Sequence, residues 1–221
     1  MLSASLSFVV TLSTGAEIGR APSEVMIIAD ETADPAVAAA DILAQSEHDK
    51  AAKAIMVTTD EKTAKQTIEE VEKQLATLET FDIASVSWID QGEVLIADNL
   101  EEAASYANVV APEHLEINVS EEKQEILIEN LRNYGSLFIG QNTAEVFGDY
   151  ASGTNHTLPT MEAARYTGGV WARTFLKIYT YQRSDRRGME KLIPIVSALA
   201  EGEGLEGHAR AARIRKNKLC E

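Results

Sequence analysis

The chain of 221 residues carries 35 acidic side chains against 20 lysines and arginines, a formal net charge of −15. This acidity argues against binding to the phosphate backbone of nucleic acids and against docking on an anionic membrane surface. A hydrophobic fraction of 45% allows a buried core, and the length suits one large domain or one domain with a tail. The single cysteine, Cys220, excludes an intrachain disulfide and a thiolate metal cluster, and it fits a reducing compartment such as the cytoplasm.

Residues 1–20 form an atypical N-terminal segment. An apolar run at residues 6–12 lies among serines and threonines, with no preceding positive charge of the kind that a signal peptide needs. The run is too short to span a membrane. This segment is therefore predicted to be an N-terminal strand or a frayed end.

From Glu24 onward, apolar runs alternate with helical patterns. Apolar runs typical of strands occur at residues 25–29, 54–58, 93–97, 115–119 and 136–140. Helical patterns separate them at residues 35–47, 60–78, 100–108 and 120–133. This order predicts a layered α/β domain with a mostly parallel sheet.

Local signals refine these elements. Asp34 followed by Pro35 is typical of a helix N-cap and first helical residue, and Thr59 and Asp98 are the expected caps of the next two helices. The alternation at residues 115–119 indicates a strand with one face in solvent.

The character of the chain changes after residue 147. Residues 148–169 hold Gly, Asn, Thr and Pro with little periodicity, which predicts one or more long loops, a usual place for functional residues. Helical patterns follow at residues 186–201, which contain Pro194, and at residues 205–216. Residues 171–221 are thus predicted to form a C-terminal helical tail.

Two pairs of polar residues lie at predicted helix ends. Gln45 and His48 are three residues apart near a helix end, so they share one face and either ligate one ion or complement the helix dipole. Glu203 and His208 flank a helix start, where they either cap the helix or offer ligands. Imidazole is both a common metal ligand and a common base near neutral pH.

Two further candidates lie near strands and loops. Glu113 and His114 follow a proline, and they form either an acid–base pair at a bent strand start or an exposed loop pair. Asp149 and His156 bracket a glycine-containing loop, where Asp149 either ligates a metal or holds the turn.

Considered together, the candidate ligands are nitrogen and oxygen donors, which suit zinc or a harder first-row metal. They are Gln45, His48, Asp149 and His208. The residues by themselves do not name a reaction. A glycine-rich nucleotide fingerprint is missing from the sequence.

Five motifs in order carry a resemblance to a known family, over about residues 21–215. They are Pro22-Ser23-Glu24-Val25, Ala44-Gln45-Ser46-Glu47-His48-Asp49, Ala111-Pro112-Glu113-His114-Leu115, Gly148-Asp149-Tyr150 with its continuation to Pro159, and Glu203-Gly204-Leu205-Glu206-Gly207-His208. In these motifs the chain resembles histidinol dehydrogenase. The resemblance implies a Rossmann-like α/β domain over residues 21–170, incomplete relative to the family, and a dimerisation role for the tail over residues 171–221.

The resemblance also implies a reaction. Family members oxidise L-histidinol to L-histidine through an aldehyde, in two NAD-dependent steps that end histidine biosynthesis. His114 corresponds to the base that takes the alcohol proton, and Glu113 corresponds to the group that activates water at the aldehyde stage. His156 matches a motif residue near the site, without an assigned role.

By the same resemblance, one zinc ion per site is held by Gln45, His48, Asp149 and His208. The implied substrate-binding residues are Ser23, Gln45, His48, His114, Asp149, Glu203 and His208. The family forms homodimers whose C-terminal segments cross between subunits, so Glu203 and His208 are expected in the neighbour's active site.

The chain departs from the family in three ways. It has about half the usual length and lacks the half that carries the NAD contacts, which implies a truncated or frame-shifted form that does not turn over histidinol alone. Ala21 stands where the family usually has glycine, and residues 1–20 do not resemble the family. Residues 164–171 look more like dehydrogenases of other polar alcohols, such as sulfopropanediol. The alternatives are therefore such a dehydrogenase and a non-catalytic zinc-binding fragment.

Overall fold

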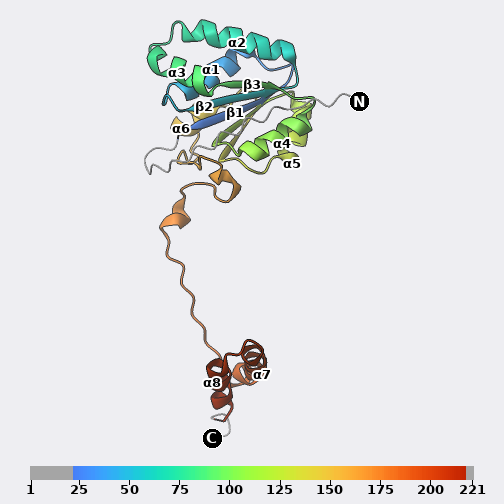
Figure 1. Ribbon diagram of the computed structural model, residues 1–221, viewed down its shortest axis with the longest axis vertical. Helices are drawn as coiled ribbons and strands as arrows, with labels where there is room; N and C mark the ends of the chain where they lie inside the picture. Colours follow the sequence, from blue (N-terminus) through green and yellow to red (C-terminus); the bar gives the residue numbers. More distant parts are fainter. Residues whose placement is uncertain (1–21, 218–221) are drawn as a thin grey trace. The chain divides into compact units, whose positions relative to one another are not determined.

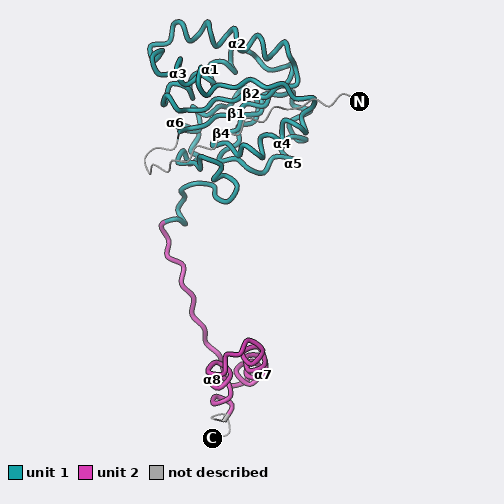
Figure 2. The backbone as a smooth tube through the Cα atoms, viewed as in Figure 1, with its two compact units in different colours: residues 1–174 teal, residues 175–221 magenta. Residues whose placement is uncertain are grey.

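The computed structural model describes residues 22–217, so the strand or frayed end expected for residues 1–20 lies outside the described part. Contacts divide the chain into two compact units, residues 1–174 and residues 175–221 (Figure 2). The two units are described separately below. None of the described helices is long and apolar enough to cross a membrane.

The first unit is built on a sheet of five parallel strands in the order β3-β2-β1-β4-β5 (Figure 1). The strands are β1 (Glu24–Ala29), β2 (Lys53–Thr58), β3 (Glu93–Ile96), β4 (His114–Asn118) and β5 (Ser136–Ile139). The α/β class and the parallel sheet predicted from the sequence are confirmed. β1 lies at the centre and is buried along its whole length, as its unbroken apolar run requires.

Helices cover both faces of the sheet (Figure 1). They are α1 (Pro35–Ser46), α2 (Glu61–Leu75), α3 (Phe81–Gln91), α4 (Leu100–Val110), α5 (Glu121–Asn130) and α6 (Glu145–Tyr150), with 3₁₀ turns at Ala163–Arg165 and Ala172–Phe175. One apolar core joins α1, α2 and α3 to β1 and β2, and a second core joins α4 and α5 to the opposite face.

The helix starts follow side-chain capping, with two corrections of one residue. Asp34 caps α1 by accepting the N–H of Ala36 at 2.8 Å, as expected. α2 is capped by Asp60 rather than Thr59, and α4 is capped by Asn99 rather than Asp98. Each of these caps accepts a backbone N–H at 2.8 Å, a bond that the residue before it does not make.

The polar side of β4 is buried, which corrects the prediction of a strand with one wet face. His114, Glu116 and Asn118 point to the same side of the sheet and are all less than 3% exposed. α6 covers this side, since the backbone N–H of Glu145 donates to Glu116 at 3.0 Å. The prediction of long loops from residue 148 was wrong at its start, because α6 runs through Gly148 to Tyr150.

The second unit contains α7 (Arg186–Gly202) and α8 (Glu206–Asn217), which pack against each other. These are the two helices that the sequence predicts, with Pro194 inside α7. Ile193 and Ala200 are buried between them, but much apolar surface stays exposed. The exposed apolar side chains of α7 are Leu192, Ile195, Val196 and Leu199.

Candidate functional site

Six side chains meet at the amino-terminal end of the sheet. Ser23 directly precedes β1, Glu113 directly precedes β4, and α1 runs back from the other end of the sheet to finish at this one. All six were predicted from the sequence. The residues are Ser23, Gln45, His48, Glu113, His114 and Asp149, with Glu145 as an unpredicted seventh member.

The Glu113 carboxylate is held at the entrance to β4. Its Oε2 accepts the hydroxyl of Ser23 at 2.5 Å and the backbone N–H of Glu24 at 3.1 Å. The same oxygen lies 3.7 Å from Nδ1 of His114. Ala111, in the left-handed region at φ 51°, turns the chain just before this pair. Glu113 and His114 are 7% and 2% exposed, so the reading as an exposed loop pair is wrong.

The two nitrogens of His114 have different surroundings. Nδ1 lies 3.1 Å from the carbonyl oxygen of Glu24, which as an acceptor fixes the proton on Nδ1. Nε2 is buried without a hydrogen-bond partner and lies 3.9 Å from Oδ1 of Asp149. In this tautomer Nε2 has a free lone pair and faces the carboxylate of Asp149, an arrangement that suits a general base.

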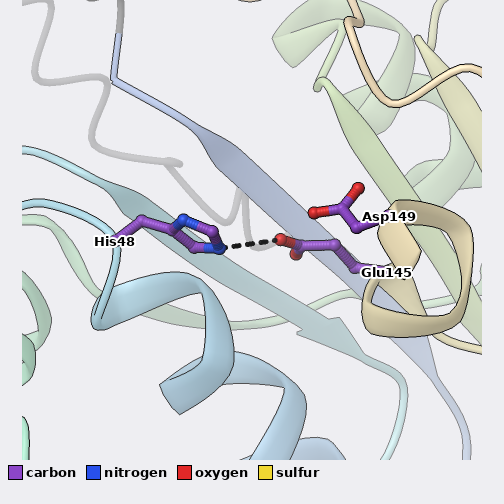
Figure 3. A group of neighbouring side chains, drawn as sticks. All are labelled: His48, Glu145 and Asp149. Carbon is purple, nitrogen blue, oxygen red and sulfur yellow. Dashed lines mark ion pairs between the residues drawn. The ribbon is translucent and has the colours of Figure 1, made fainter.

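Glu145, on α6, connects the predicted residues, and the sequence analysis missed it. Its Oε1 lies 3.5 Å from Nε2 of His48, and its Oε2 lies 3.8 Å from Nδ1 of His114 (Figure 3). Gln45, with its amide nitrogen toward Glu145, donates to Oε2 at 2.8 Å and accepts from Ser23 at 3.0 Å. A usable signal was present: Glu145 and Asp149 are four residues apart and share one face of a helix.

The part of the site that could hold a metal ion consists of His48, Glu145 and Asp149. Their ligand atoms all lie within 4.8 Å of one another (Figure 3). One imidazole and two carboxylates are a donor set that fits zinc. Two of these residues belong to the predicted ligand set, whereas Gln45 reaches the group through its bond to Glu145.

The site is rich in negative charge. The hydrogen bond to Glu145 raises the pKa of His48, and the charge of Asp149 adds to this effect. Burial raises the pKa of Glu24, although the charge of Lys53 opposes the shift. In the described residues, the basic side chains in direct contact with Glu113, Glu145 and Asp149 are imidazoles, those of His48 and His114.

The remaining predicted residues lie elsewhere. His156 is exposed in the loop after α6, where Asn155 forms an Asx turn by accepting the N–H of Thr157 at 3.1 Å. Glu203 follows α7, and His208 lies in the first turn of α8 beside a groove between α7 and α8. Glu203 and His208 both lie in the second unit, whereas the side chains that meet in the site all belong to the first unit.

Comparisons with known proteins place the chain in a family. A model of the histidinol dehydrogenase family matches residues 8–216, so the likeness begins within the segment expected to differ from the family. The chain is 42% identical over 201 residues to a histidinol dehydrogenase homolog of Shouchella clausii, and 45% identical over 194 residues to the histidinol dehydrogenase of Methanosarcina mazei. These matches cover 91% and 88% of this chain, but 47% and 44% of the relatives.

A solved structure agrees with this assignment. The crystal structure of histidinol dehydrogenase from Elizabethkingia anophelis superposes with a TM-score of 0.85 at 38% identity, covering 93% of this chain and 47% of that one. The chain therefore spans about half the length of the relatives that it matches. From the family match and the shared fold, the chain belongs to the histidinol dehydrogenase family.

Proposed function

We propose that the chain supplies the zinc-binding and proton-transfer part of an enzyme that oxidises L-histidinol to L-histidine through the aldehyde, with NAD, in the cytoplasm. The observation that carries the proposal is the buried, unpartnered Nε2 of His114 beside a three-residue cation site. A dehydrogenase of this kind needs both a base for the alcohol proton and a group that fixes the alcohol oxygen.

The residues divide the work between them. His114 accepts the alcohol proton at Nε2, while the Glu24 carbonyl keeps the other proton on Nδ1. Glu113 accepts a proton from the water that attacks at the aldehyde stage, and Ser23 orients its carboxylate. When bound, NAD would supply the hydride acceptor for both oxidations.

The donor set of the site suits zinc. His48, Asp149 and Gln45 would hold the ion, together with His208 from the tail of a second copy. When bound, zinc supplies a Lewis acid that fixes a hydroxyl and lowers its pKa. Ser23 and Glu203 would contact the substrate.

The charge of the site favours a cationic substrate. Glu113, Glu145 and Asp149 contact imidazoles and no lysine or arginine among the described residues. The ammonium group of L-histidinol is attracted by these carboxylates, whereas the sulfonate of sulfopropanediol is repelled. We therefore favour histidinol over the anionic alternative.

The assembly follows from the same proposal. Several apolar side chains on α7 are exposed, and a second copy of the chain would bury them in a homodimer. We assign NAD binding to the sequence that the full-length relatives have beyond this match. Accordingly, the 221-residue chain alone is expected to bind zinc but not to form NADH from histidinol.

The proposal is tested by zinc affinity, measured by titration calorimetry on the purified chain. His48→Ala should weaken zinc binding by more than about 100-fold, because it removes a ligand. His156→Ala, which removes an exposed histidine outside the site, is the matched control and should leave the affinity unchanged. Equal affinities for the two variants would contradict the ligand assignment.

A further inference from the structure

Glu116 is a carboxyl group at the centre of the sheet. It lies in the middle of β4, opposite Ile27 of β1 and Phe138 of β5, and is 0% exposed. Its Oε1 accepts the backbone N–H of Glu145 at 3.0 Å, whereas its buried Oε2 has no donor. An ionised carboxylate in such a place is strongly disfavoured unless its remaining oxygen finds a proton.

Asp41 of α1 completes the arrangement. Its Oδ2 is also buried without a donor, and its carboxyl lies next to that of Glu116. Two neighbouring ionised carboxylates repel each other in such a buried place. Burial raises the pKa of Asp41 to about 6 and raises the pKa of Glu116 well above its ordinary range.

The Glu116 carboxyl holds the start of α6. Ala144, the residue before α6, has no side chain that can cap the helix, and Glu116 provides the acceptor instead. One turn later, Gly148 lies so close to the Phe138 ring that a Cβ there would be 2.9 Å from it. α6 is therefore attached to the sheet at both points, with Glu145 and Asp149 directed into the site (Figure 3).

We propose that Glu116 is a positioning residue of the site: by accepting the Glu145 N–H it fixes α6, and through α6 it fixes the carboxylates of Glu145 and Asp149. Glu116 is not itself one of the three residues of the candidate metal position. The zinc readout of this inference rests on the proposed function, whereas the hydrogen bond from Glu145 to Glu116 does not.

The test compares two replacements of Glu116 with a control on the same strand. In Glu116→Gln, the amide oxygen can accept the Glu145 N–H and the amide nitrogen can donate to Asp41. Glu116→Leu can do neither. Ile117→Ala opens a cavity on the opposite side of β4, against α4 and α5, and controls for a general loss of stability. Zinc affinity is measured by calorimetry, and the exchange rate of the Glu145 amide is measured by NMR.

Glu116→Leu should weaken zinc binding by about 10- to 100-fold, as is typical when a residue that orients a ligand is lost. Glu116→Gln should stay within about threefold of the wild type, because the amide oxygen of the glutamine still accepts the Glu145 N–H. Ile117→Ala should also stay within about threefold despite its lower stability. A loss in Glu116→Gln as large as in Glu116→Leu, or an equal loss in Ile117→Ala, would overturn the inference.

The amide measurement separates this inference from the proposed function. If the wild-type chain binds no zinc, the ligand assignment fails, but the exchange rate of the Glu145 amide still decides the role of Glu116. That amide should be protected in the wild type and in Glu116→Gln, and should exchange at least roughly tenfold faster in Glu116→Leu. Should Glu116→Leu not fold, an unprotected Glu145 amide in the wild type or in Glu116→Gln would overturn the inference.

Discussion

Buried acidic groups at the two ends of the parallel sheet differ in their hydrogen-bond partners and in the direction of their pKa shifts. At the carboxyl-terminal end, Asp30 is fully buried, and its oxygens accept from Lys123 Nζ at 2.7 Å, from Thr32 and from the backbone of Ser120. Burial alone would raise the pKa of Asp30, but these donors outweigh it and lower the pKa. Toward the amino-terminal end, the buried carboxyls accept from no lysine or arginine among the described residues, and the shifted pKa values of Glu24, Asp41 and Glu116 are raised.

This difference indicates which end is structural and which is functional. Open α/β sheets ordinarily bind ligands at the carboxyl ends of their strands, where the strand order reverses. Here that place, between β1 and β4, holds a hydrogen-bond network of this chain's own residues around Asp30. In residues 22–217, the cluster at the amino-terminal end has no such lysine or arginine among its direct contacts, and its carboxylates attract a cation.

The largest expected effect comes from breaking the carboxyl-terminal network. Lys123→Met leaves Asp30 buried without its cation and should lower the free energy of unfolding by about 2–4 kcal/mol, less than for a fully buried pair because Lys123 is partly exposed. Urea denaturation measures this loss. Lys65→Met removes an exposed helical ion pair and should have no measurable effect. Zinc affinity should not change, and a large loss of zinc binding in Lys123→Met would contradict the division between the two ends.

A smaller effect comes from pH. The folded-state pKa of Asp41, about 6, is above its ordinary value of 3.8, so the acid form of this residue favours folding. Its contribution is complete below about pH 4 and is lost as the pH rises through about 6, which amounts to roughly 1–3 kcal/mol. Asp41→Asn cannot ionise and should lack this decline. Urea denaturation of both proteins from pH 4 to 7 gives the comparison, and parallel curves would exclude the raised pKa.

The smallest effect concerns the attachment of α6. Gly148→Ala places a Cβ against the Phe138 ring and should lower the free energy of unfolding by about 1–2 kcal/mol, while also weakening zinc binding. Gly207→Ala, in α8, meets no atom within 4 Å and should leave zinc affinity unchanged. Thermal unfolding and calorimetry measure both quantities. Unchanged zinc affinity in Gly148→Ala would show that α6 need not lie so close to the sheet.

Much of the fold follows from the sequence because its signals are strong and local. The strands around Ile27 and Met56 are continuous apolar runs, and Asp34 with Pro35 marks the start of α1 to the residue. α3 was missed because residues 81–91 mix apolar and polar side chains without a clear apolar stripe, and Ile89 indeed stays exposed. The burial of Glu116 was not predictable, since alternation shows which residues share a side of a strand but not what covers that side.

The candidate site was predictable where residue type and motif agreed. Ser23, Gln45, His48, Glu113, His114 and Asp149 were all named from the sequence and lie together. Glu145 was missed because no helix was predicted over residues 145–150, and without a helix its spacing to Asp149 has no meaning. Pairings such as Asp41 with Glu116 join residues 75 positions apart and depend on tertiary packing. The contribution of His208 depends on a second unit and a second copy, which no local pattern describes.

The central claim is that the amino-terminal end of the sheet binds the metal ion. The most direct measurement is anomalous X-ray diffraction at the zinc edge from crystals of the zinc-loaded chain. The account predicts one strong peak per site, in contact with His48 and Asp149 and within reach of His114. A peak beside Asp30 and Lys123, or no peak at the amino-terminal end, would contradict it.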